Sequence, residues 1–234
     1  MPYRRLPNTD KARIAALEKA VAMEHAYDVE HQAASYKTLN EARAFVRRFK
    51  SAVEQSQYCY TTQAEANRRY QEHLKTARLY ISHFIQVLNL AVVRNEVRKE
   101  HKLFYGLDPD DFAVPDLTSE KHILMWGERL IEGERERLSH GGAPIYNPTI
   151  AKVSVHYDIF KDAYREQQNY KLNTTRSQSG LDALREEADR IILDLWNQVE
   201  AYYGSLPPAE RLSRCQAYGI VYYYRNGEKR PEND

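Results

Sequence analysis

Apolar side chains recur every three or four residues through residues 38–95, a long stretch that contains neither glycine nor proline. The pattern is aliphatic and aromatic at both ends and polar in the middle. Its positions are Leu39, Ala42, Val46, Phe49, Val53, Ser56, Tyr60, Gln63, Asn67, Tyr70, Leu74, Ala77, Ile81, Phe84, Leu88 and Ala91. A repeat with this period is typical of an α-helix that buries one face, and we call it the first seam.

The first seam begins at a capping box made by Thr38 and Glu41 and weakens near its middle. A single helix over this stretch would be about 85 Å long, whereas a compact chain of this length has a radius of gyration of about 17 Å. We therefore predict a helical hairpin that bends at residues 60–62, where Thr62 and Glu65 offer a second capping box. One kinked helix is the alternative, because no glycine marks the bend.

A second seam follows the pair Asn147-Pro148, which favours a helix start with asparagine as the cap and proline in the first turn. A break is predicted at Ser177-Gln178-Ser179-Gly180, followed by a return arm. The apolar positions before the break are Ile150, Val153, Tyr157, Phe160 and Tyr164, and those after it are Leu181, Leu184, Ala188, Ile191, Leu195, Val199 and Tyr202.

The two seams align when the chain is shifted by 111 residues, which places Phe49 on Phe160 and Gln57 on Gln168. Such sparse identities also arise by chance between amphipathic helices, so duplication and coincidence both stay open. The alignment defines a first repeat at 38–106, a bridging segment at 107–147, a second repeat at 148–219 and a C-terminal segment at 220–234.

Shorter elements complete the prediction. Asn8 or Thr9 caps an N-terminal helix that ends near residue 25, and residues 27–35 form a connection. Thr118 or Ser119 caps a bridging helix that ends at Leu138, and another short helix lies between residues 208 and 218. Residues 220–225 suit a strand before an Asn226-Gly227 turn, with the N-terminal segment or the segment after Gly106 as partner. The expected fold is all-α: one domain over residues 1–234, built as a four-helix bundle from two tandem helical hairpins.

Composition adds a cytoplasmic setting to this picture. The start of the chain has no apolar run typical of a secretory signal, and the most apolar stretch, residues 79–93, is too short and too polar to span a bilayer. The 2 cysteines lie far apart, which is typical of free thiols in a reducing compartment. Residues 1–105 contain 18 Lys and Arg against 11 Asp and Glu, a net charge of +7, and the rest of the chain contains 16 against 22, a net charge of −6.

Catalytic motifs are not evident in the sequence. A di-iron bundle needs Glu-x-x-His on inward-facing helices, and no such spacing occurs. Cys59 and Cys215 lack a recognisable base or oxyanion motif, and Gly141-Gly142 precedes Ala-Pro, unlike a phosphate-binding loop. We predict no catalytic residue, no metal site and no cofactor, while a role as an enzyme stays open and is less favoured.

Two surfaces could bind partners. The first is basic and consists of Arg47, Arg48, Arg68 and Arg69 near the predicted hairpin tip, where they would contact a polyanion. The second is aromatic, because the chain has 18 Tyr against 6 Phe, and it consists of Tyr202, Tyr203, Tyr222, Tyr223 and Tyr224. Packing of these tyrosines inside the domain is the alternative.

Several long segments resemble a family of uncharacterised proteins from Bacteroidetes-type bacteria. They are the opening MPYRRLPNTD, ARLYISHFIQVLNLAVVR, FYGLDPDDFAVPDL, GGAPIYNPTIAKV and LDLWNQVEAYY. The resemblance covers nearly the full chain. It implies a helical architecture and a cytoplasmic setting, and it assigns no activity, ligand or catalytic residue.

The sequence therefore favours a non-enzymatic scaffold or protein-interaction module that binds a protein partner or a second copy of itself. Nucleic-acid binding through the basic surface is one alternative, which the near-zero net charge disfavours. A small-ligand binder or enzyme that uses the bundle core is the other. No association with a membrane is expected.

Overall fold

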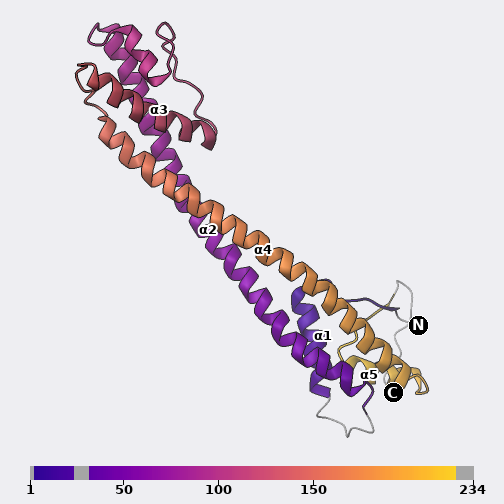
Figure 1. Cartoon of the computed structure of the whole chain (residues 1–234). Helices are drawn as coiled ribbons and strands as arrows, with labels where there is room; N and C mark the ends of the chain where they lie inside the picture. Colours follow the sequence, from indigo (N-terminus) through magenta and orange to yellow (C-terminus); the bar gives the residue numbers. More distant parts are fainter. Residues whose placement is uncertain (1–2, 24–31, 225–234) are drawn as a thin grey trace. The chain divides into compact units, whose positions relative to one another are not determined.

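The chain is mostly helical, as the computed structural model in Figure 1 shows, which confirms the all-α prediction. The structure describes residues 3–23 and 32–224. Within them lie β1 (Tyr3–Arg4), α1 (Asp10–Met23), α2 (Tyr36–Val93), the 3-10 helix η2 (Lys99–Tyr105), α3 (Glu120–Ser139), α4 (Ile150–Tyr202), α5 (Pro208–Ala217) and β2 (Tyr222–Tyr223).

Neither long seam bends back on itself, so the two predicted hairpins are wrong. The helix of α2 continues through residues 60–62, and that of α4 continues through residues 177–180. Gly180 does not adopt a positive φ, and a Cβ added there would meet nothing within 4 Å. A lone glycine weakens a helix without ending it. α2 ends instead just before Asn95, which has a φ of 59°.

The buried stripe differs from the first seam in the middle of α2. Tyr60 is 59% exposed and Asn67 is also exposed, whereas Ala66 is buried and Cys59 is half-buried. The middle of α2 has few apolar residues from which the helical period can be counted. The predicted buried positions are therefore shifted by one residue from the observed ones there. A similar shift occurs at the end of α4, where Tyr203 is buried and Tyr202 is not.

The chain forms two compact units, and each contains part of α2 and part of α4. Unit 1 comprises residues 1–60 and 173–234, and unit 2 comprises residues 61–172. These boundaries cut across the predicted repeats at 38–106 and 148–219, because each unit takes one part from each repeat. The duplication itself stays a prediction.

In unit 1 the first part of α2 packs antiparallel to the last part of α4. Thr38 donates to Asp194 at 3.1 Å, and Arg48 pairs with Glu187 farther along both helices. The core contains aromatic and aliphatic side chains from α1, α2, α4 and the segment after α5, including Leu17, Leu39, Phe49, Ile192, Trp196 and Tyr218. Burial of these side chains is the main force that holds unit 1 together.

Unit 2 is built around the remaining parts of α2 and α4, with α3 and η2 against them. Its core includes Ile81, Phe84, Tyr105, Ile123, Leu130, Val153 and Phe160. Gly127 of α3 lies directly against the ring of Tyr157 on α4. The Tyr70 hydroxyl donates to Glu120 over 2.6 Å, which links α2 to the first turn of α3.

Serine or threonine side chains cap the N-termini of α1, α2, α3 and α4. Thr9 caps α1, with its hydroxyl accepting from the Ala12 N–H at 3.2 Å, and Ser119 caps α3, both as predicted. Ser35, rather than Thr38, caps α2. Thr149, rather than Asn147, caps α4. Thr38 lies in the first turn of α2, and its hydroxyl is used for the contact with Asp194.

The opposite charges of the two halves of the sequence combine within each unit. Unit 1 has 18 Lys and Arg against 17 Asp and Glu, a net charge of +1, and unit 2 has 16 of each, a net charge of 0. Neither unit therefore has the excess positive charge expected of a protein that mainly holds a polyanion.

Part of α2 is long and apolar enough to cross a membrane by length and composition alone. Its most apolar window has a mean hydropathy of 1.2, and 44% of it is buried inside the protein. Core helices of soluble proteins pass the same criterion, so a membrane role finds only weak support here. The expectation that no segment spans a membrane stays a prediction.

The short C-terminal strand pairs with the N-terminal segment, one of the two partners predicted for it. β1 and β2 are antiparallel, with Tyr3 opposite Tyr223 and Arg4 opposite Tyr222. The predicted Asn226-Gly227 turn, the tail beyond it and most of the connection at 27–35 lie outside the described residues.

Candidate binding pocket in unit 1

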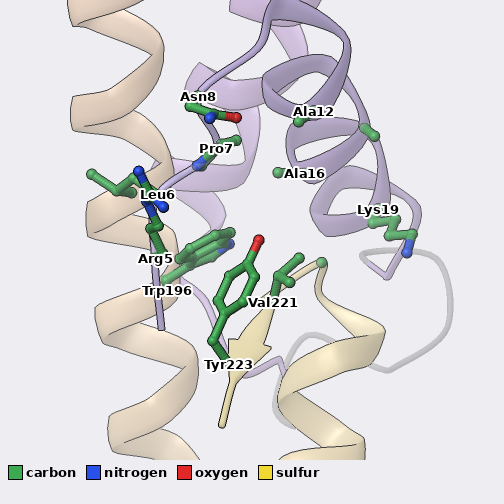
Figure 2. Close-up of a pocket in the computed structure, with 12 residues that line it drawn as sticks. Arg5, Leu6, Pro7, Asn8, Ala12, Ala16, Lys19, Trp196, Val221 and Tyr223 are labelled. Atoms are coloured by element: carbon green, nitrogen blue, oxygen red, sulfur yellow. The ribbon is translucent and has the colours of Figure 1, made fainter. Parts of the chain in front are cut away.

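A pocket of about 190 Å³ lies where α1, α4 and the β1–β2 ribbon meet in unit 1. Its lining comes from the segment before α1, one face of α1, one residue of α4 and the segment around β2 (Figure 2). The lining residues are Arg5, Leu6, Pro7, Asn8, Ala12, Ala15, Ala16, Lys19, Trp196, Gly219, Val221 and Tyr223.

The walls approach closely because small residues face one another. Gly219 follows α5 with a φ of +88°, a conformation that L side chains rarely adopt. A Cβ at this position would lie 3.0 Å from the Ala16 carbonyl oxygen of α1. Gly219 therefore lets the chain turn against α1 and enter β2, which places Val221 and Tyr223 at the pocket.

Two of the residues that line the pocket are aromatic. Trp196 of α4 is only 1% exposed and belongs to the core of unit 1, while Tyr223 is 45% exposed. Figure 2 shows these two rings and Val221 grouped between the helices, with Ala12 and Ala16 of α1 across from them. The pocket therefore has partly apolar walls, to which Tyr223 and Val221 contribute exposed surface.

The charged groups of the pocket are both cations. Arg5 and Lys19 are exposed, and neither has a carboxylate partner among the described residues. The lining contributed by the described part of the chain contains no aspartate or glutamate. The two acids of α1 are paired elsewhere, Asp10 with Arg185 and Glu18 with Lys50. The pocket consequently has a positive rim that its own walls do not neutralise.

Polar contacts hold the ribbon and α1 on α4 around this pocket. Arg4 of β1 pairs with Glu200 at 3.0 Å, and the Tyr222 hydroxyl of β2 donates to the same carboxylate at 2.7 Å. On α1, Arg13 pairs with Asp189 through two hydrogen bonds of 2.8 and 2.9 Å. Burial and the hydrogen bond to Glu200 raise the pKa of Tyr222, so its hydroxyl stays a donor at neutral pH.

Reactive groups are scarce around the pocket. The described lining residues include no cysteine, histidine, serine or threonine, and Lys19 and the Tyr223 hydroxyl are the titratable groups among them other than arginine. Cys215 lies behind β2 with no exposed surface, and burial raises the pKa of its thiol. Such a thiol is a poor nucleophile.

The predicted aromatic surface is only partly a surface. Tyr202 and Tyr223 are exposed, Tyr222 and Tyr224 are half-buried, and Tyr203 is 7% exposed and packs against Tyr202 and Tyr218. The alternative, packing within the domain, is therefore correct for Tyr203.

The predicted basic surface was placed at the tip of a hairpin, and this hairpin does not form because α2 is continuous. Arg47 and Arg48 belong to unit 1, and Arg68 and Arg69 belong to unit 2. All four are exposed, but Arg48 pairs with Glu187 and lies over the Phe45 ring at 5.3 Å from its centre.

Unit 2 contains a buried ionic cluster. Glu134 and Arg137 of α3 are 0% and 1% exposed and form two hydrogen bonds of 2.9 Å, and the Tyr105 hydroxyl donates to Glu134. Arg137 also donates to the Ala143 carbonyl at 2.7 Å, and Glu134 accepts from the Ile145 N–H. Every member is satisfied by its own chain, so this cluster fixes the loop after α3 rather than binding a ligand.

Among the described residues, no group of three or more His, Cys, Asp and Glu side chains is arranged to hold a metal ion.

Of the residues that line the pocket, only Tyr223 was predicted from the sequence to belong to a binding surface. The others lie on short segments whose meeting depends on tertiary structure. Two weak signals were present: the small-residue face of α1, formed by Ala12, Ala15 and Ala16, and the glycine directly before the C-terminal strand.

Comparisons with known proteins identify no relative of this chain. No protein-family model matches the chain, and neither a curated protein nor a solved structure matches it.

Proposed function

We propose that this protein is a non-enzymatic binding protein and that the pocket of unit 1 is its recognition site. This proposal keeps the binding role favoured by the sequence and moves it from the tyrosine-rich surface to a specific cavity. A cytoplasmic setting is part of the same proposal.

One observation carries the proposal: the pocket combines a core tryptophan with two cations that no carboxylate of residues 3–23 and 32–224 neutralises. A cavity with an apolar interior and a few polar groups is the usual form of a ligand site. The near absence of nucleophiles and acid–base groups favours binding over catalysis. The basic surface supports nucleic-acid binding less well, because Arg48 is engaged by Glu187 and both units are close to neutral.

A fragment screen by protein-observed NMR tests the proposal. Uncharged and charged single-ring fragments would be added to the full chain, and shifts of the Trp196 indole N–H would be followed. We expect some fragments to shift this resonance in a saturable way, and Ala12→Leu to abolish the shift by filling half-buried space at the pocket.

Ala201→Leu is the matched control, since it adds the same side chain at an exposed position of α4 within unit 1 that does not line the pocket. It should leave the fragment shifts unchanged. If no fragment shifts Trp196, or if the two leucine variants behave alike, the pocket is not a recognition site.

Protein partners remain a second candidate because of one feature of the ribbon. Tyr3 and Tyr223 are 47% and 45% exposed and lie opposite each other, with ring centres 6.0 Å apart. Exposed tyrosines are frequent in protein interfaces. A partner could place one of its groups in the pocket while it contacts these rings, so the two candidates share one face of unit 1.

A further inference from the structure

We infer that the pocket of unit 1 binds an apolar group of about single-ring size that carries a carboxylate. The inference rests on the proposed function and adds the chemical class of the occupant. It follows from the size, the polarity and the charge of the pocket.

Size sets the first limit. An apolar cavity of about 150 Å³ holds one benzene molecule, and this pocket measures about 190 Å³. It has room for one ring or a branched aliphatic group with a small polar head, and not for a nucleotide or another two-ring ligand.

The walls determine what the buried part of the occupant is. Apart from the two cations and Asn8, the lining is apolar or aromatic, with Trp196, Tyr223 and Val221 on one side and the alanines of α1 on the other. Tyr223 and Val221 are 45% and 50% exposed, so contact with another ring or an alkyl group would remove their apolar surface from water, whereas Trp196 is already buried.

The rim determines the sign of the polar head. A cationic occupant would be repelled by Arg5 and Lys19, and no acid among the described lining residues would compensate for them. Arg5 favours a carboxylate in particular, since a guanidinium donates two parallel hydrogen bonds to its oxygens.

Two sources could supply this chemistry: a free small carboxylic acid, or the carboxyl end of a polypeptide whose last residue is apolar. Both would present the same group to the pocket. They differ in the rest of the molecule, which for a peptide would extend past the exposed Tyr3 and Tyr223.

The test uses four small probes and the full chain in a Trp126→Phe background, so that Trp196 is its one tryptophan. The probes are phenylacetate, its neutral analogue phenylacetamide, phenethylamine and acetate, followed by fluorescence and by the Trp196 indole resonance. We expect phenylacetate to bind with a Kd of about 1 mM, and the other three to bind at least about tenfold more weakly.

The charge variants identify the groups responsible. Arg5→Gln should weaken phenylacetate binding about tenfold and Lys19→Gln by less, because only the guanidinium of Arg5 donates two parallel hydrogen bonds to a carboxylate. Lys11→Gln is the matched control, since Lys11 is an exposed cation of α1 outside the pocket lining, and it should leave the Kd unchanged. Raising the salt concentration should weaken phenylacetate and leave phenylacetamide unaffected.

The source of the carboxylate is tested with an acetylated tetrapeptide ending in phenylalanine, as the free acid and as the C-terminal amide. Tighter binding of the acid peptide than of phenylacetate identifies a chain end, and weaker binding identifies a small acid. Equal binding of phenylacetate and phenylacetamide would overturn the inference while the pocket still binds ligands. Failure of every fragment and probe would refute the proposed function itself.

Discussion

Gly127 and Gly180 both lie inside helices, but a methyl group added to each would meet different surroundings. At Gly180 nothing lies within 4 Å of the new carbon, whereas at Gly127 the carbon would lie 2.2 Å from the Tyr157 ring. Alanine is favoured over glycine in a helix by about 1 kcal/mol. Steric overlap inside a packed interface costs about 1–3 kcal/mol.

Gly180→Ala should therefore raise the free energy of unfolding by about 0.5–1 kcal/mol, and Gly127→Ala should lower it by about 1–2 kcal/mol. Urea denaturation measures both, with Trp196 reporting on unit 1 and Trp126 on unit 2 in single-tryptophan variants. Destabilisation by Gly180→Ala would mean that this residue lies in a turn.

The Asp10–Arg185 pair makes the attachment of α1 sensitive to acid. The hydrogen bond and charge of Arg185 hold the pKa of Asp10 below its ordinary value. A carboxyl group whose pKa is lower in the folded state stabilises that state above its unfolded pKa, about 3.9. This contribution is lost as the pH falls through the lower folded value.

We expect the stability of unit 1 to be constant from about pH 7 to 5 with respect to this pair, and to fall below about pH 4. Asp10→Asn should lower the stability at pH 7 and flatten the acid dependence. Urea midpoints at several pH values in the single-Trp196 protein measure this, and an unchanged acid slope in Asp10→Asn would assign the sensitivity to other carboxyl groups.

At the scale of elements, the helices were more predictable than their ends and bends. The periodic apolar positions at both ends of each seam identified α2 and α4, because burial of one face imposes a helical period. The caps at Thr9 and Ser119 were also readable from local sequence. The prediction of a bend in each seam was wrong. A polar stretch of helix can continue when a neighbouring helix packs along it, and the sequence does not show that neighbour.

The continuity of α4 predicts a strong response to proline. Ser179→Pro would remove a hydrogen bond inside the helix and clash with the preceding turn, at a cost of about 3 kcal/mol. A turn at this position would accept the same change with little loss. Unfolding of unit 1, followed by Trp196 fluorescence, distinguishes the two cases.

Tyr36→Pro provides the control for that experiment. Tyr36 is the first residue of α2 and is 60% exposed, and proline is well tolerated in a first turn. Comparable effects of the two proline substitutions would argue against a continuous α4.

At the scale of the whole molecule, charge balance becomes visible only once the pairing of segments is known. Residues 1–105 have a net charge of +7 and the rest of the chain has −6, yet each compact unit is nearly neutral. We therefore expect the protein to elute from heparin at low salt, and replacement of Arg68 and Arg69 by glutamine to change this little. Retention that persists above about 0.3 M salt would instead favour the nucleic-acid alternative.

The candidate site was the least predictable part of the molecule for the same reason. Trp196, Gly219 and the face of α1 are far apart in sequence, and no local motif joins them. They meet because residues 36–60 pair with residues 173–202 and α1 and the ribbon pack on that pair. Periodicity identifies helices that bury a face, but it does not determine which helices share a core.

The pairing within unit 1 is therefore the central claim, and cysteine cross-linking tests it most directly. In a Cys59→Ser, Cys215→Ser background, Thr38→Cys with Asp194→Cys should cross-link rapidly, because the native side chains are hydrogen-bonded at 3.1 Å. The comparison pair is Thr38→Cys with His83→Cys, which a bend at residues 60–62 would bring together. Cross-linking of the first pair alone is predicted, and cross-linking of the second pair alone would contradict the fold and the pocket built on it.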